Sequence, residues 1–124
     1  MHSVIETPPF LAAARNEGID DAERESIVSY FASHPSAGEV IPGTGGARKV
    51  RIAGRSKGKS GGYRVVTFYA ADDMPVFLLT VYGKGRRANL SKSERNALRE
   101  LLTALPREWR AERIARLEKR RRER

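Results

Sequence analysis

Residues 76–81 read Val-Phe-Leu-Leu-Thr-Val, and this run decides the fold. Its apolar side chains occupy both odd and even positions, whereas successive side chains of a strand point to opposite faces of a sheet. A strand with this pattern is buried on both faces. The run therefore predicts a central strand over residues 76–82, in a sheet that helices cover on each side.

Two neighbouring segments supply partners for this strand. Residues 63–70 form a β-branched and aromatic run, which a short polar connection joins to the central strand. Residues 48–53 alternate, with Val50 and Ile52 on one face and basic side chains on the other. The three segments predict an antiparallel meander whose first strand has a basic outer face.

The N-terminal segment predicts a short strand and a helix. Residues 3–6 alternate polar and apolar side chains, and we expect them to add a strand at an edge of the sheet. Thr7 then precedes two prolines, as an N-cap does at the start of a helix. We expect this helix to end at Asn16.

A second helix and a long connection follow. Asp20 or Asp21 can cap the helix, and the pair His34-Pro35 ends it. Residues 35–46 contain two prolines and four glycines, which disfavour both helix and strand. We expect this segment to be a long connecting loop.

The third helix has the clearest start signal. Ser91 and Glu94 form a capping-box pattern before leucines 98, 101, 102 and 105, whose spacing places them on one helical face. Pro106 is expected to interrupt this helix. Residues 107–124 carry nine basic and four acidic side chains around Trp109 and are expected to be a helical extension.

The order of elements predicts an α+β fold, with a small, twisted, mainly antiparallel sheet packed against two N-terminal helices and one C-terminal helix. Residues 1–105 are expected to form the domain, and residues 106–124 a basic C-terminal extension. A chain of 124 residues can bury one core. The absence of cysteine excludes disulfides and thiolate-zinc sites, and no apolar run predicts a membrane span or secretion signal. We therefore expect a cytoplasmic protein.

Charge is unevenly placed along the chain. Residues 1–46 carry two basic and seven acidic side chains, whereas residues 47–124 carry twenty-two basic and eight acidic ones. Clustered Lys and Arg bind polyanions by releasing condensed counterions. The second part of the chain therefore indicates a nucleic-acid partner.

The sequence resembles the RelE superfamily, in its HigB-like branch, over residues 4–105. Three ordered motifs carry the resemblance: Gly43-Thr44-Gly45-Gly46-Ala47-Arg48-Lys49-Val50-Arg51, Gly58-Lys59-Ser60-Gly61-Gly62-Tyr63-Arg64-Val65-Val66 and Tyr82-Gly83-Lys84. It implies the toxin of a type II toxin-antitoxin system, which cleaves messenger RNA on the ribosome. It also implies a helix-turn-helix, HigA-like antitoxin as partner, in a toxin-antitoxin hetero-oligomer.

Cleavage of RNA without a metal needs a base for the 2′-hydroxyl, cations for the phosphorane and an acid for the leaving 5′-oxygen. We expect Lys57 and Lys59, in a glycine-rich loop, to act as base and phosphate clamp. Arg64, at the charged end of an apolar strand face, is expected to stabilise the transition state. Tyr82 is expected to stack on a base or donate a proton, and Lys84 to reach the same phosphate.

Further basic residues extend this surface. Those expected to bind RNA are Arg48, Lys49, Arg51 and Arg55. No metal or cofactor site is expected. His2 lies at the terminus and His34 at a helix end, and neither neighbours another candidate, so a pair of catalytic histidines is not expected.

Other interpretations of the same residues stay open. The lysine loop can be a solvated loop, Arg64 can form an ion pair with Asp72, Asp73 or an N-terminal acid, and Tyr82 can be an ordinary strand aromatic. For the whole chain, the alternatives are a DNA gyrase inhibitor of the ParE branch, which shares the fold, and a non-catalytic ribosome-binding protein.

Overall fold

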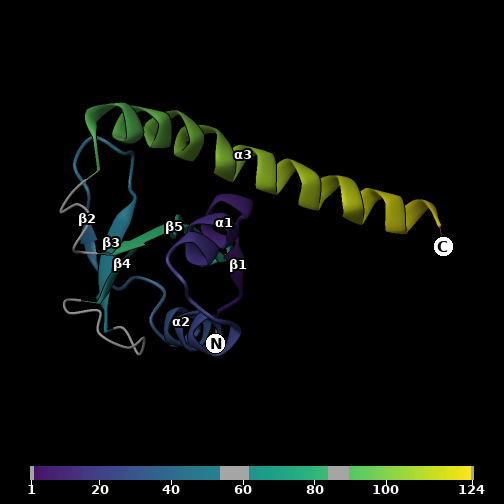
Figure 1. The fold of residues 1–124 in the computed structure, drawn as a ribbon. Helices are drawn as coiled ribbons and strands as arrows, with labels where there is room; N and C mark the ends of the chain where they lie inside the picture. Colours follow the sequence, from purple (N-terminus) through teal and green to yellow (C-terminus); the bar gives the residue numbers. More distant parts are fainter. Residues whose placement is uncertain (1, 54–61, 84–89, 124) are drawn as a thin grey trace.

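The computed structural model describes residues 2–53, 62–83 and 90–123 (Figure 1). These residues form an α+β fold, as the sequence predicts. The elements follow one another in this order: β1 (Val4–Glu6), α1 (Pro8–Asn16), α2 (Asp21–Ser33), β2 (Glu39–Val40), β3 (Arg48–Ile52), β4 (Tyr63–Phe68), β5 (Val76–Gly83) and α3 (Lys92–Arg122).

The strands form one mixed sheet in the order β1-β5-β4-β3-β2. β1 pairs in parallel with β5, and the remaining neighbours pair antiparallel. The predicted meander and the predicted edge strand are therefore confirmed. The segment 35–46 is not irregular throughout, because Glu39 and Val40 pair with β3. No local pattern predicts β2, since two residues are too few to show a period.

β5 is interior and buried on both faces, as its apolar run predicts. On one face, Val76, Leu78 and Val81 of β5 share a core with Phe10 and Ala14 of α1 and with Ile27 and Phe31 of α2. On the other face, Phe77, Leu79 and Tyr82 share a core with Leu102 of α3, against which Leu98, Leu105 and Trp109 also pack. Helices therefore cover both faces of the sheet, as predicted.

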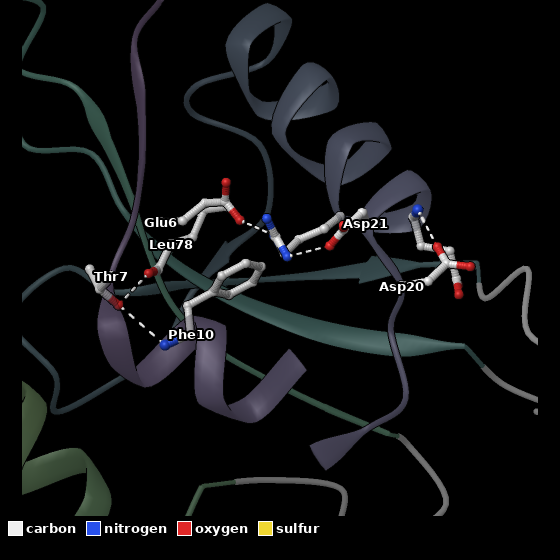
Figure 2. A network of polar contacts seen from close by, with 8 residues as sticks. Glu6, Thr7, Phe10, Asp20, Asp21 and Leu78 are labelled. Carbon is white, nitrogen blue, oxygen red and sulfur yellow. Dashed lines mark hydrogen bonds and ion pairs between the residues drawn. The ribbon is translucent and has the colours of Figure 1, made fainter. Parts of the chain in front are cut away.

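Two polar contacts hold the N-terminal segment on the sheet (Figure 2). The Thr7 hydroxyl accepts a hydrogen bond from the backbone N–H of Phe10 and donates one, 2.7 Å long, to the carbonyl of Leu78 in β5. Arg24 of α2 forms an ion pair with Glu6 of β1, with 2.6 Å between Nε and Oε2. The cap of α1 thus also fixes the helix to the central part of the sheet.

Pro106 does not end the third helix, contrary to the expectation from the sequence, because α3 continues from Lys92 to Arg122. A proline inside a helix costs about 3 kcal/mol, since it removes a backbone hydrogen bond and crowds the preceding turn. Packing on both sides of the proline offsets this cost. Leu102 is buried before it, and the Trp109 ring meets the Phe77 ring edge-on after it, with centroids 5.8 Å apart.

Asp73, in the connection between β4 and β5, fastens α3 beyond the proline. Nε and Nη2 of Arg110 donate to the two carboxylate oxygens of Asp73 over 3.3 and 3.2 Å, and Nη1 of Arg113 donates to its backbone carbonyl over 3.4 Å. The first turns of the predicted extension therefore contact the folded body. That residues 106–124 act as a unit of their own stays a prediction.

Gly38, just before β2, adopts a backbone conformation with φ of +99°, and an added Cβ would lie 2.5 Å from both the Lys49 carbonyl oxygen and Cγ2 of Val50. We expect Gly38→Ala to lower the free energy of unfolding by about 3 kcal/mol, through backbone strain and overpacking together. Gly18→Ala is the matched control, because Gly18 has φ of +73° but nothing within 4 Å of its Cβ position. It should cost about 1 kcal/mol. Equal losses in urea denaturation would contradict the close packing of β2 on β3.

The contact between Asp73 and Arg110 should depend on pH. Hydrogen bonds from Arg110 hold the pKa of the Asp73 carboxyl below its ordinary value. Its contribution to stability is therefore present above the pKa of the unfolded chain, about 3.9, and lost as the pH falls further through the lower folded pKa. A double-mutant cycle with Asp73→Asn and Arg110→Gln should show favourable coupling at pH 7 that disappears toward pH 3. No coupling at pH 7 would show that this contact does not fasten α3.

Candidate nucleic-acid interface

The candidate site lies at one end of the sheet, where β3 ends, β4 begins and β5 ends. Ile52, Tyr63 and Gly83 are paired in register across these strands. One residue further into the sheet, Arg51 pairs with Arg64 and Arg64 pairs with Tyr82. Residues directly opposite each other in an antiparallel sheet have Cα atoms about 4.5–5.5 Å apart and share a face. The three side chains therefore form one row on the α3 side of the sheet.

A pocket of 350 Å³ opens beside this row. Its lining residues are Gly38, Glu39, Lys49, Val50, Arg51 and Arg64. Three basic residues predicted from the sequence, Lys49, Arg51 and Arg64, therefore meet in one cavity. β2 supplies the opposite wall, where Glu39 is in register with Lys49. Gly38 and Glu39 could not be assigned to the site from local sequence patterns, because both lie in the segment expected to be an irregular loop.

The two arginines of the row lack acidic partners. Within the part of the chain that the structure describes, neither Arg51 nor Arg64 forms an ion pair or a side-chain hydrogen bond. Nη1 of Arg64 is buried without a hydrogen-bond partner. Like charges directly opposite each other destabilise a sheet, and a buried unsatisfied donor costs about 1–3 kcal/mol. An anion bound in the pocket would relieve both costs.

The structure does not support the alternative in which Arg64 pairs with Asp72 or Asp73. Asp72 accepts a hydrogen bond from the Tyr69 hydroxyl over 2.8 Å, and Asp73 binds Arg110. The hydrogen bond to Asp72 raises the pKa of Tyr69 above its ordinary value. Both carboxylates thus have other partners.

Two residues that the sequence predicts for the site, Tyr82 and Arg48, do not line the pocket. Tyr82 is in the row, but its ring is only 4% exposed and forms part of the core under α3, so a base could stack on it only after neighbouring side chains move. Arg48 points to the other face of β3, since it shares its parity with Val50, and its Nη1 donates to the carbonyl of Gly38 over 3.0 Å. Arg48 therefore supports the turn before β2.

The remaining predicted residues lie outside the described part of the chain. They are Arg55, Lys57 and Lys59, between Ala53 and Gly62, and Lys84, which directly follows β5. Ala53, Gly62 and Gly83 all flank the end of the sheet that carries the arginine row. The described chain therefore stops and resumes at the end of the sheet that carries the pocket.

Neither histidine lines the pocket. The His2 ring contacts the Tyr69 hydroxyl over 2.8 Å, and the His34 ring stacks on Tyr30 with centroids 4.7 Å apart. No group of three or more His, Asp or Glu side chains suited to a metal ion occurs among residues 2–53, 62–83 and 90–123. The ionisable groups that line the pocket are the guanidinium groups of Arg51 and Arg64, the Lys49 ammonium group and the Glu39 carboxylate.

Comparisons with known proteins show which family the chain belongs to. A free double arginine-to-alanine mutant of the E. coli toxin RelE is similar in structure, with 17% sequence identity and a TM-score of 0.48. The match covers 68% of this chain and 85% of that one. The family described as the RelE toxin of the RelE/RelB toxin-antitoxin system matches residues 3–122. The chain therefore belongs to the RelE toxin family.

Proposed function

We propose that the chain is a ribosome-dependent messenger RNA endoribonuclease, the HigB-like toxin of a type II toxin-antitoxin system, acting in the cytoplasm. One observation carries the proposal: Arg51 and Arg64 lie opposite each other on neighbouring strands, neither forms an ion pair with a described residue, and a guanidinium nitrogen of Arg64 is buried and unsatisfied. A fold tolerates such an arrangement where binding of an anion repays it. A phosphate of RNA is the anion that the family suggests.

The proposed reaction is attack of a ribose 2′-oxygen on the neighbouring phosphorus, which breaks the bond to the 5′-oxygen and leaves a 2′,3′-cyclic phosphate. Arg64 and Arg51 stabilise the extra negative charge of the phosphorane through their guanidinium groups. An arginine does not act as base, because it effectively stays protonated. The proton transfers therefore fall to Lys57, Lys59, Lys84 and the Tyr82 hydroxyl, without a metal ion.

The pocket also supports a proposal for the partner. An exposed cationic cavity attracts acidic segments, and complementary charge accelerates and directs association. The helix-turn-helix antitoxin of the proposed pair would silence the toxin by covering Lys49, Arg51 and Arg64. Its HigA-like identity is part of the proposal.

Arg64→Ala should remove cleavage with little loss of fold. Because a donor aimed at developing negative charge typically contributes about 10²–10³-fold in rate, we expect cuts in messenger RNA to fall by that factor. The measurement maps 5′ ends of messenger RNA on translating ribosomes after brief induction. Arg15→Ala, an exposed arginine of α1, is the matched control and should cleave like the native chain.

The same experiment separates the rival functions. Native chain that arrests growth while messenger RNA stays intact would contradict the nuclease. Inhibition of DNA supercoiling by gyrase would then support a ParE-like toxin, and ribosome binding alone would support a non-catalytic protein. Circular dichroism of both variants tests whether Arg64 is instead needed for folding.

A further inference from the structure

The C-terminal half of α3 leaves the folded body. After Trp109, Arg110 and Arg113 the helix makes no contact with the sheet, and residues 114–123 are all exposed. Figure 1 shows this half of α3 projecting beyond every other described element. No described helix is both long enough and apolar enough to cross a membrane. A projecting helix of this kind contributes little to the core, so its composition reflects another constraint.

The projecting half carries a row of arginines. Residues 107–122 carry eight basic and three acidic side chains. Arg113, Arg116 and Arg120 follow one another at steps of three and four residues, so these three form one arginine face. Glu112 lies one turn before Arg116 and Glu123 one turn after Arg120, so one acidic side chain borders this face at each end.

The arginine face is not neutralised by the described part of the chain. The guanidinium groups of Arg116 and Arg120 make no ion pair or hydrogen bond with any described residue. Arg113 uses one nitrogen on the backbone of Asp73. Arginine presents a planar fork of donors that matches phosphate oxygens. The face therefore offers a row of guanidinium groups for phosphate oxygens along about two helical turns.

We propose that the arginine face of α3 binds the phosphate backbone of duplex RNA, as an anchor that is separate from the pocket of Lys49, Arg51 and Arg64. The inference rests on the proposed function, because the ribosome supplies the RNA helices. Duplex RNA is recognised largely through its shape and backbone, which suits a row of arginines without aromatic stacking residues.

A membrane surface fits this helix less well than RNA. An interfacial helix buries a continuous apolar face opposite its charges. Among residues 110–123 the only large apolar side chains are Ile114 and Leu117, which are 57% and 49% exposed and border the arginine face. The contacts of Arg110 and Trp109 with the body also fix the direction of the helix, so the anchor would hold the pocket at a set distance from the bound duplex.

The test uses the full chain carrying Arg64→Ala, so that RNA stays uncut and cleavage does not enter the result. Arg116→Gln with Arg120→Gln removes two charges from the arginine face. Lys119→Gln with Arg122→Gln removes two charges of the same turns that lie outside the arginine face and is the matched control. Binding to a labelled 20-base-pair RNA duplex, and to phosphatidylserine vesicles, is measured by anisotropy and sedimentation at several salt concentrations.

We expect the arginine-face variant to bind the duplex about tenfold more weakly at 0.1 M salt, with a salt slope smaller by about two, because two phosphate contacts are lost. The control variant should bind within about twofold of the parent. Equal losses in both variants, or none, would overturn the proposal, as would a loss confined to vesicles. Native chain that binds the duplex but leaves messenger RNA intact would refute the nuclease alone.

Discussion

The structure depends on covering β5 from both sides. Its alternate side chains enter two separate cores, so neither face of the sheet can be left to solvent. α1 and α2 cover one face, and α3 covers the other even though Pro106 lies within it. The strand that demands this cover also carries Tyr82 to the end of the sheet, beside Arg64. The core thereby places the candidate site.

At that end of the sheet, stability and function favour different residues. A sheet selected for stability alone would pair Arg64 with an acid or replace it, since an arginine opposite another arginine brings repulsion and desolvation. Asp72 and Asp73 lie in the connection between β4 and β5, at the other end of the sheet, where Tyr69 and Arg110 engage them. Glu39 lines the pocket but forms no ion pair with a described residue. The uncompensated charge is therefore localised at the pocket, where an RNA phosphate would compensate it.

Much of this could be predicted from the sequence, and the exceptions have physical causes. The caps at Thr7 and Ser91 and the run 76–82 predicted elements that the structure contains, because caps and apolar periods are local signals. β2 and the continuation of α3 through Pro106 could not be predicted, because tertiary contacts stabilise both.

The site was predicted in part. Parity identified Arg51 and Lys49 as neighbours on one face, but the sequence could not show that Arg48 turns to Gly38 or that the Tyr82 ring is buried under α3. Both depend on the packing of segments far apart in the chain. The RelE family model matches residues 3–122 and so includes most of α3, whereas the motifs found in the sequence supported the resemblance only over residues 4–105.

The central claim is that Arg64 is retained for an anion and not for the fold. The free energy of unfolding of Arg64→Met tests it most directly, because methionine keeps much of the apolar stem and removes the charge. We predict a value equal to that of the native chain or about 1 kcal/mol higher, since repulsion from Arg51 and an unsatisfied buried donor both disappear. A loss of about 3 kcal/mol or more, as expected when a buried ion pair is broken, would contradict the account.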